Sequence, residues 1–395
     1  MDARLLRTAA AVVLLAGCAP AEDPPSGGPP ADGTTAPGGP SAAPEPALEV
    51  EVVVDGLRHP WDVALLPGGA ALITERGGRL LTHDERGTRE IEADLGDLFV
   101  GSEAGLMGLE VSPRFAEDRE IFLCHATRTG DGAPRDVRVT RWRLEEDIGT
   151  AERIGTVVDG LPISSGRHSG CRLRFAPDGV LHVGTGDAAR SGTSQDLGSL
   201  GGKTLRVHPD GTVPRDNPFA GRPGDAALVH TYGHRNVQGL AVQPGTGTMW
   251  SAEHGPGTDD EINVLVPGGN YGWDPGPGYD ESVPMTDLER FPDAVEAAWS
   301  SGRPTVALSG AAFLSGEQWG AWDGALAVAE LKNTGVAVHG VDGTRITGTT
   351  RMTALEDVHG RLRSPTLDDD GALWVTTANG TDDAVLRVTA RPGGR

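Results

Sequence analysis

Residues 170–188 read GCRLRFAPDGVLHVGTGDA, two short apolar strands on either side of the turn Pro177, Asp178 and Gly179. Tight turns favour these three residue types, and apolar residues alternate with others in the flanking segments. Six repeats of about 45 to 70 residues, each long enough for four short strands, are typical of blades around a central channel. The sequence therefore predicts an all-β fold, a six-bladed β-propeller with four-stranded antiparallel blades. The other five hairpins begin near Trp61, Gly105, Gly239, Ser309 and Arg363.

A pair of β-sandwiches is the alternative, since 58 glycines and 29 prolines suit any fold with many tight turns. Such a protein would not repeat one hairpin six times. No convincing amphipathic helix follows Leu48. Because the inner strands of a propeller converge on its channel, we expect a functional site at their ends and in the adjoining loops.

The N-terminal segment has the features of an export signal. A short apolar run follows Arg7 and ends in Leu-Ala-Gly-Cys at Cys18, which resembles the lipobox of bacterial lipoproteins. We expect residues 1–18 to form the signal that ends at a lipidated Cys18, residues 19–47 to be a disordered Pro/Gly/Ala-rich tether, and residues 48–395 to form the propeller. The protein would then be exported, extracytoplasmic and held at the membrane by that lipid alone. An ordinary cleaved signal with an incidental cysteine is the alternative.

The formal net charge of -22 is spread along the chain, which argues against nucleic-acid binding and suits cations. Export implies an oxidising compartment, so Cys124 and Cys171 are candidates for a disulfide. Two buried thiols are the alternative.

Two polar clusters border the predicted inner strands. His168 enters the first strand of the quoted hairpin and Asp187 follows the second, so the turn brings the imidazole and the carboxylate together. An aspartate orients a histidine ring and leaves the other nitrogen free to take a proton. The stretch YGHRNVQGL, residues 232–240, places Arg235 and Asn236 before another apolar strand. Solvated surface residues are the alternative for both clusters.

Two further clusters suit charged ligands. Gly255 and Pro256 form a sharp turn that presents backbone carbonyls, and acidic residues up to Glu261 follow, which are oxygen ligands that hard cations prefer. Three cations occur late in the chain. Two of them, Arg361 and Arg363, lie two residues apart, so in an extended segment their side chains point the same way. Taken together they suggest a small ligand with several carboxylates, whereas pairing with local acids is the alternative. These cations are Lys332, Arg361 and Arg363.

These motifs resemble those of the soluble PQQ-dependent glucose and aldose sugar dehydrogenases, six-bladed propellers that bind pyrroloquinoline quinone (PQQ) and Ca2+ above the channel. The resemblance runs from about His59 to Thr389, and its most specific segments are GHRNVQGL and EHGPGTDDEINVLVPGGNYGW, in that order. The long insertions of the glucose dehydrogenases are short or missing here. The resemblance is therefore closer to the monomeric aldose dehydrogenases.

The resemblance implies a role for each matching residue. His168 matches the catalytic base, Asp187 the aspartate that supports it, and Arg235 a catalytic residue near the reactive quinone carbonyl. Gly255 and Pro256 match the carbonyl ligands of the cofactor-bound Ca2+. Glu261 and Tyr271 match a second, structural Ca2+ site. Cofactor contacts are implied for His168, Arg235, Asn236, Glu103, Lys332, Arg361 and Arg363, and for Trp299 as an aromatic at the mouth of the site.

Two positions depart from the family pattern. Arg167 precedes the base where the family often has an acid or a histidine, and Cys171 replaces the second glycine of the usual His-x-Gly-Gly. A cysteine at that place, with Cys124 on the preceding repeat, strengthens the disulfide prediction.

The implied function is PQQ- and Ca2+-dependent oxidation of the anomeric hydroxyl of an aldose to the lactone, with hydride transfer to PQQ and later electron transfer to an unidentified acceptor. A Ca2+-dependent propeller lactonase or esterase is the first alternative, although such enzymes usually hold the ion with side chains and have no use for the three late cations. A non-catalytic extracellular binding propeller is the second, and it would not need His168 beside Asp187.

Overall fold

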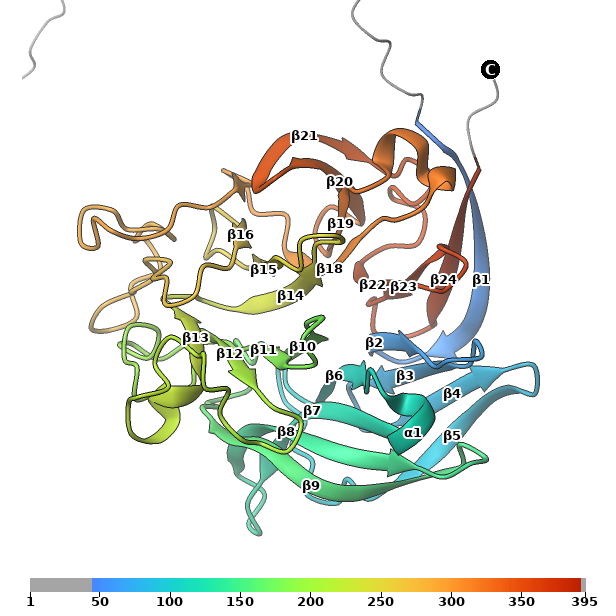
Figure 1. Ribbon diagram of the computed structural model, residues 1–395, viewed down its shortest axis with the longest axis horizontal. Helices are drawn as coiled ribbons and strands as arrows, with labels where there is room; N and C mark the ends of the chain where they lie inside the picture. Colours follow the sequence, from blue (N-terminus) through green and yellow to red (C-terminus); the bar gives the residue numbers. More distant parts are fainter. Residues whose placement is uncertain (1–44, 392–395) are drawn as a thin grey trace, which may run out of the picture. The chain divides into compact units, whose positions relative to one another are not determined.

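The computed structural model describes residues 45–391, and β-strands make up most of the regular structure in that part of the chain (Figure 1). The short apolar runs bounded by Gly, Pro and Asp form these strands, so the all-β prediction is confirmed. Helical structure in the described part is limited to one short α-helix and two 3-10 helices. They are α1 (Phe115–Asp118), η1 (Gly224–Leu228) and η2 (Glu317–Trp322).

The strands fall into six groups of four, taken in chain order. Groups 1 and 2 contain β2 (Pro60–Leu65), β3 (Ala71–Glu75), β4 (Leu80–Asp84) and β5 (Gly87–Ala93), then β6 (Leu106–Val111), β7 (Glu120–Arg128), β8 (Pro134–Leu144) and β9 (Thr150–Leu161). Groups 3 and 4 contain β10 (Arg172–Phe175), β11 (Leu181–Gly184), β12 (Lys203–Val207) and β13 (Val229–Tyr232), then β14 (Val237–Val242), β15 (Met249–Glu253), β16 (Glu261–Val264) and β17 (Trp299–Ser300). Groups 5 and 6 contain β18 (Leu308–Phe313), β19 (Leu326–Glu330), β20 (Gly335–Asp342) and β21 (Arg345–Arg351), then β22 (Leu362–Leu367), β23 (Leu373–Thr377), β24 (Asp383–Arg391) and β1 (Ala47–Leu57).

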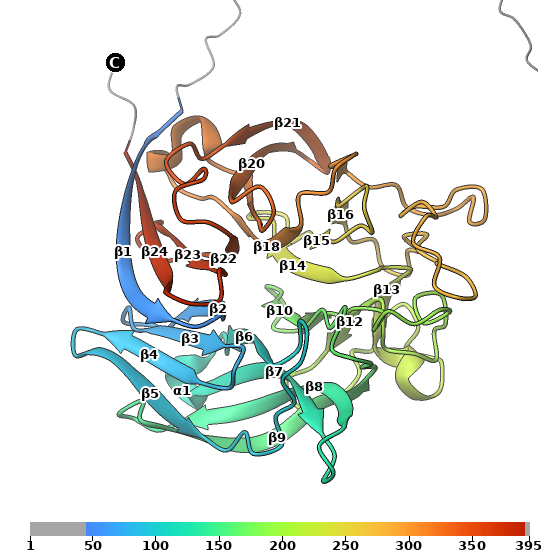
Figure 2. The same cartoon turned by 180° about the vertical axis from the view of Figure 1, so that it is seen from behind.

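The first strands of the groups form a closed ring around the centre of the fold (Figures 1 and 2). Each contacts the next, in the order β2, β6, β10, β14, β18, β22 and back to β2. The sixth group is completed by β1, which pairs antiparallel with β24 and so joins the two ends of the described chain in one sheet. Each predicted hairpin begins with one of these inner strands or within a few residues of it.

One feature differs from the predicted antiparallel pattern. Groups 1 and 2 are joined into an eight-stranded sheet because β5 pairs with β9 in parallel, through the register Glu92 with Thr150 and Ala93 with Ala151. The other four groups form separate four-stranded antiparallel sheets. No sequence pattern indicates this short parallel contact, which involves the outermost strands of the two groups.

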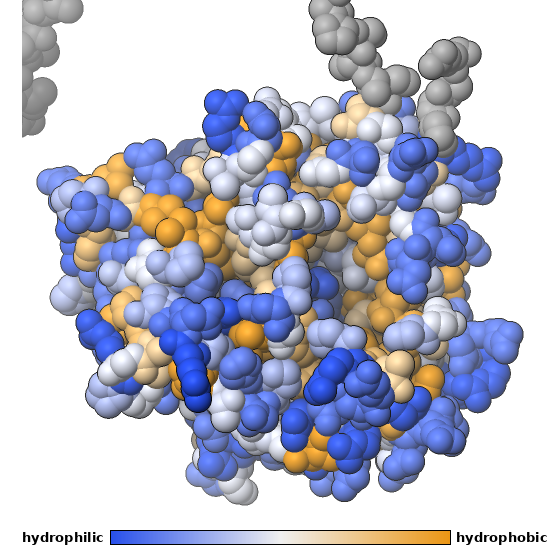
Figure 3. Space-filling view, viewed as in Figure 1, coloured by the Kyte–Doolittle hydropathy of each residue, from blue (hydrophilic) through white to orange (hydrophobic). Residues whose placement is uncertain are grey.

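Apolar side chains between neighbouring sheets hold the ring together. Between groups 4 and 5, for example, Trp250 of β15 packs edge-on against Phe313 of β18, with ring centroids 6.0 Å apart, in a cluster that includes Ile262 and Val328. Hydrophilic residues dominate the face seen in Figure 3, and hydrophobic residues show mainly between them. No helix in residues 45–391 has the length and apolar character needed to cross a membrane.

A disulfide joins group 2 to group 3, as the sequence predicts. Cys124 lies in β7 and Cys171 lies directly before β10, with their Cα atoms 5.6 Å apart, and both side chains are fully buried. The bridge therefore fixes the chain three residues beyond His168.

Reduction of this disulfide should destabilise the protein. We expect a loss of about 2 to 5 kcal/mol in unfolding free energy, because the bridge restricts the unfolded chain. Thermal unfolding with and without reductant measures the loss. The double variant Cys124→Ala/Cys171→Ala is the control, since its midpoint should not respond to reductant. An equal response of both proteins would contradict the prediction.

Candidate active site

A cavity of about 240 Å³ lies where the inner strands of several groups end. Trp61 of β2, Gln238 of β14 and Arg363 of β22 line it, together with Gly170 from the loop before β10. Five of the residues predicted from the sequence also line it: Glu103, Gly255, Lys332, Arg361 and Arg363. The fold thus gathers residues that are up to 302 positions apart, from Trp61 to Arg363.

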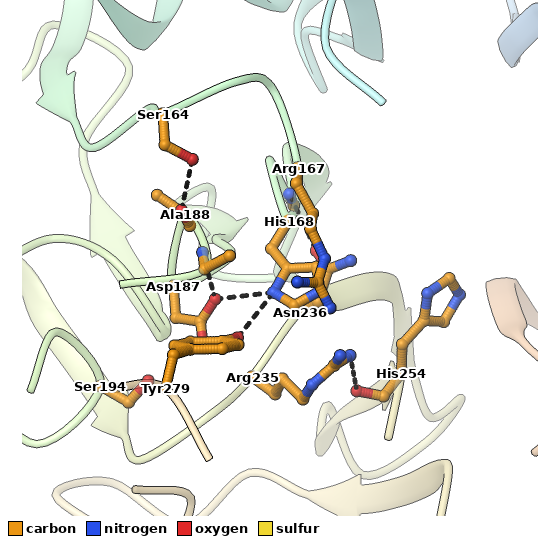
Figure 4. Close-up of polar contacts among 12 residues, drawn as sticks. Ser164, Arg167, His168, Asp187, Ala188, Ser194, Arg235, Asn236, His254 and Tyr279 are labelled. Carbon is orange, nitrogen blue, oxygen red and sulfur yellow. Dashed lines mark hydrogen bonds and ion pairs between the residues drawn. The ribbon is translucent and has the colours of Figure 1, made fainter. Parts of the chain in front are cut away.

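His168 and Asp187 meet beside this cavity, as the hairpin predicted (Figure 4). The His168 Nδ1 atom lies 2.8 Å from Asp187 Oδ1, and both side chains are almost completely buried. The Nε2 atom of His168 makes no hydrogen bond within residues 45–391. With the Nδ1 proton donated to the carboxylate, Nε2 carries the lone pair and is placed to accept a proton.

The backbone brings the two loops into very close contact. The amide of Ala188 donates to the carbonyl of His168 at 3.2 Å, and His168 itself has a positive φ of 53°. A Cβ atom at Gly186 would lie 2.0 Å from that same carbonyl oxygen, so only glycine fits there. The imidazole is therefore positioned by backbone contacts as well as by Asp187.

A third loop, between β13 and β14, joins this pair. The amide of Asp187 donates to the carbonyl of Arg235 at 2.9 Å. The Asn236 side chain accepts from the amide of Gly170 at 3.1 Å and donates to Glu103 Oε2 at 3.1 Å. The predicted residues Glu103, His168, Arg235 and Asn236 thus lie in one connected network.

The turn at Gly255 and Pro256 is anchored by Asp260. Its Oδ1 accepts from the Gly255 amide at 2.8 Å, and its Oδ2 accepts from the amides of Val306, at 2.7 Å, and Ala307. The carbonyl oxygens of Gly255 and Pro256 accept no hydrogen bond from any residue in the described range. Two neighbouring carbonyl oxygens that accept no hydrogen bond are oxygen ligands of the kind that suits a hard cation.

Within residues 45–391, no ion pair involves the late cations Lys332, Arg361 and Arg363, although Lys332 Nζ donates to Thr305 Oγ1. Arg363 Nη1 donates to Gln238 at 3.0 Å, and burial, followed by the neighbouring Arg172, lowers the pKa of Arg363 to about 9. A group carrying several carboxylates would supply the missing counter-charge, so these residues fit a polyanionic cofactor.

Two buried nitrogen atoms near the cavity also lack partners in the described structure. They are Nε of Arg235 and Nε2 of His254, a residue that lines the cavity. Burial first, and then Arg235 and Arg363, lower the pKa of His254 to about 3, so this ring is neutral. Unpaired buried donors and acceptors of this kind are typical of a site that a ligand completes.

The predicted second metal site is less complete. Glu261 is buried and its carboxylate accepts from Thr286 at 3.0 Å and from Asn263 at 3.3 Å, while burial and Glu253 raise its pKa. The Tyr271 hydroxyl instead bonds to the backbone of β16 and the segment after it. Across residues 45–391, no three His, Cys, Asp or Glu side chains form a group able to hold a metal ion.

The structure does not bring Trp299 to the cavity. It lies on β17, the outermost strand of group 4, and its ring packs edge-on against His339 with centroids 4.9 Å apart. Trp299 is therefore not among the residues that line the cavity, and its place at the mouth of the site stays a prediction. Its pairing with Ile262 in β16 turns it toward the interface with group 5 instead.

A family model described as glucose / sorbosone dehydrogenase matches residues 57–387. The chain belongs to this family.

Similar proteins and solved structures support this family assignment. Aldose sugar dehydrogenase YliI of Escherichia coli is 34% identical over 356 residues, which cover 87% of this chain and 93% of that protein. The crystal structure of the soluble aldose sugar dehydrogenase from E. coli in its apo-form matches with a TM-score of 0.79 and 32% identity, over 87% of this chain and 100% of that one. The PQQ-bound form of aldose sugar dehydrogenase from Streptomyces coelicolor matches with a TM-score of 0.72 and 30% identity, over 89% and 100% of the two chains. This glucose/sorbosone dehydrogenase family member is thus an oxidoreductase.

Sequence reasoning missed several residues that complete the site of this family member. Tyr279 and Trp273 both bond to Asp187, and Glu281 pairs with Arg167 and Arg235. Trp273 stood inside a recognised motif, but nothing in its neighbours marked it as a donor to Asp187. Tyr279 and Glu281 lie in an irregular segment 46 to 114 residues from these partners, where local sequence carries no signal of contact.

Replacing Asp260 by Asn should loosen the Gly255 turn. The side chain of asparagine has one oxygen that accepts and one NH2 group that only donates, so it cannot accept from all three backbone N–H groups. At least one N–H group then stays unpaired, at a cost of about 1 to 3 kcal/mol. We expect a lower unfolding midpoint by calorimetry. Asp259→Asn is the matched control, because that carboxylate accepts only from the Ser300 hydroxyl. Equal losses in both variants would contradict the role given to Asp260.

Proposed function

We propose that the protein oxidises the anomeric hydroxyl of an aldose to the lactone, with PQQ and Ca2+ as cofactors. The observation that carries this proposal is a buried His168–Asp187 pair with a free Nε2, next to a cavity lined by three cations that have no ion-pair partner within the described structure. The names of its relatives support the substrate class and the quinone cofactor.

We further infer that the fold is a six-bladed β-propeller. The closed ring of six inner strands supports this, because in such a fold each four-stranded group is one blade. On this interpretation, the β1–β24 pairing closes the ring, and the active-site loops lie at the ends of inner strands. The joined sheet of groups 1 and 2 is then a contact between the outer edges of two blades.

The residues that would hold the cofactors follow from their chemistry. The guanidinium and ammonium groups of Arg361, Arg363 and Lys332 would bind carboxylates, and the carbonyls of Gly255 and Pro256 would bind Ca2+. Bound there, PQQ would supply the two-electron acceptor that protein side chains lack, with Ca2+ adding positive charge beside it.

The protein's own residues would carry the proton chemistry. His168 Nε2 would remove the proton of the sugar hydroxyl, and Asp187 would stabilise the imidazolium that forms. Arg235 is held by its bond to the His254 carbonyl at 3.0 Å and would place positive charge where negative charge develops. Electrons would then leave to a separate acceptor, and we expect the protein to act as a monomer.

Reconstitution tests this function. Purified protein is loaded with PQQ and Ca2+ and assayed for dye reduction with a panel of aldoses. We expect turnover that requires both cofactors. His168→Gln should still bind PQQ, measured by calorimetry, but lose about 10²- to 10⁴-fold in kcat, the contribution of a general base.

Arg363→Gln separates binding from chemistry in the same assay. This variant should bind PQQ more weakly, because it removes a cation that lines the cavity. Lactone hydrolysis by protein loaded with Ca2+ but without PQQ would instead favour the esterase alternative. Full activity of His168→Gln would rule out the proposed base.

We also propose that the protein is exported and held at the membrane through Cys18. The residues concerned, 1–18 of the signal and most of the 19–47 tether, lie outside the described range. In a bacterial host, wild-type protein should fractionate with membranes and Cys18→Ala should not, as followed by immunoblotting. Identical fractionation of the two proteins would contradict lipidation.

A further inference from the structure

The Asp187 carboxylate is surrounded by donors. Its Oδ1 accepts from His168 Nδ1 at 2.8 Å and from the Ala189 amide at 2.8 Å. Its Oδ2 accepts from Trp273 Nε1 at 2.8 Å and from the Tyr279 hydroxyl at 2.7 Å. Two of these donors therefore come from the segment between β16 and β17, which belongs to a different group of strands from the histidine.

Tyr279 touches both members of the pair (Figure 4). Its hydroxyl lies 2.9 Å from His168 Nδ1 as well as 2.7 Å from Asp187 Oδ2. Burial, and then Asp187, raise the pKa of this phenol, so it keeps its proton and remains a donor. The hydroxyl has only one proton to give, so it can satisfy either the carboxylate or the ring nitrogen.

Only one arrangement of protons satisfies all three groups. If Tyr279 donates to Asp187, then His168 Nδ1 must carry a proton and donate it to the other carboxylate oxygen, which leaves Nε2 unprotonated. If Tyr279 instead donated to Nδ1, that unprotonated nitrogen would face Asp187 Oδ1 at 2.8 Å with two lone pairs opposed. The first arrangement is therefore favoured, and it is the one that makes Nε2 a base.

The segment that carries Tyr279 is tied down next to the base. The Tyr279 amide donates to Ser191 Oγ at 3.0 Å, and the guanidinium of Arg167 lies over the phenol ring, 5.7 Å from its centroid. Two residues later, Glu281 pairs with Arg167 at 2.6 Å and also with Arg235. Arg167, which directly precedes His168, thus helps to hold the tyrosine in place.

We propose that Tyr279 is a positioning residue that, by occupying the second oxygen of Asp187, holds the carboxylate against His168 Nδ1 and limits how strongly its charge acts on the ring. The proposal rests on the function proposed above only for the use of His168 as a base. Its structural content, the effect of one hydroxyl on the Asp187–His168 pair, concerns the protein alone.

Tyr279→Phe removes the hydroxyl and keeps the ring under Arg167. The other charged and titratable groups around the imidazole stay unchanged: Asp187, Arg167, Arg235, Glu281, Glu103 and His254. With one donor fewer, the charge of Asp187 acts more fully on the ring and favours the imidazolium. We therefore expect the acidic limb of the kcat/KM profile to move up by about half to one pH unit, and kcat at neutral pH to fall about 3- to 10-fold.

A spectroscopic measurement tests the tautomer without any turnover. In cofactor-free protein with ¹⁵N-labelled histidine, long-range ¹H–¹⁵N spectra should show neutral wild-type His168 protonated at Nδ1, and the imidazolium form should persist to higher pH in Tyr279→Phe. Tyr232→Phe is the matched control, because it loses the same hydroxyl without contacting His168 or Asp187. That control should leave both the spectrum and the pH profile as in the wild type.

The outcomes distinguish the two proposals. An Nε2-protonated His168 in the wild type, or an unchanged spectrum and pH profile in Tyr279→Phe, would overturn the role of Tyr279 even if sugars are oxidised. The expected change in the Tyr279→Phe spectrum without any sugar oxidation would overturn the proposed function and leave the role of Tyr279 standing. If Tyr279→Phe fails to fold, an Nε2-protonated neutral His168 in the wild type would still overturn the proposal.

Discussion

The active site depends on the burial of one charge. The Asp187 side chain has no exposed surface, and an isolated buried carboxylate would be strongly destabilising. It is accommodated because four donors converge on it, from the loop before β10, its own loop and the segment after β16. These hydrogen bonds hold each donor in position, and because His168 is one of the donors, they also hold the proposed base.

That arrangement works only on a closed ring. The donors to Asp187 lie on groups 3 and 4, while the cations and Glu103 reach the same cavity from groups 2, 5 and 6. A shift between neighbouring sheets would change distances that hydrogen bonding holds near 3 Å. The pairing of β1 with β24 and the disulfide between Cys124 and Cys171 both restrict such shifts, one at the ends of the described chain and one beside His168.

The sequence predicted the parts of this design that are local. Period-two apolar runs and Pro/Asp/Gly turns located the inner strands, and the hairpin geometry alone brought His168 to Asp187. The spacing of Arg361 and Arg363 correctly placed both on one side of an extended segment, where they line the cavity. Contacts between distant irregular segments left no such pattern, which is why Tyr279 and Glu281 were missed. The packing of Trp299 against His339 was not foreseen for a related reason: it depends on how the long segment before β17 returns to the sheet.

The charges that line the cavity determine which ligands it suits. The chain carries a formal net charge of -22, yet no ion pair within residues 45–391 involves the three cations of the cavity. Burial and the neighbouring Arg172 lower the pKa of Arg363. A ligand that brought carboxylates to this place would favour the charged form of Arg363, and this attraction would add to its binding free energy. By mass action the same ligand would stabilise the folded chain, because the cavity that binds it exists only in the closed ring.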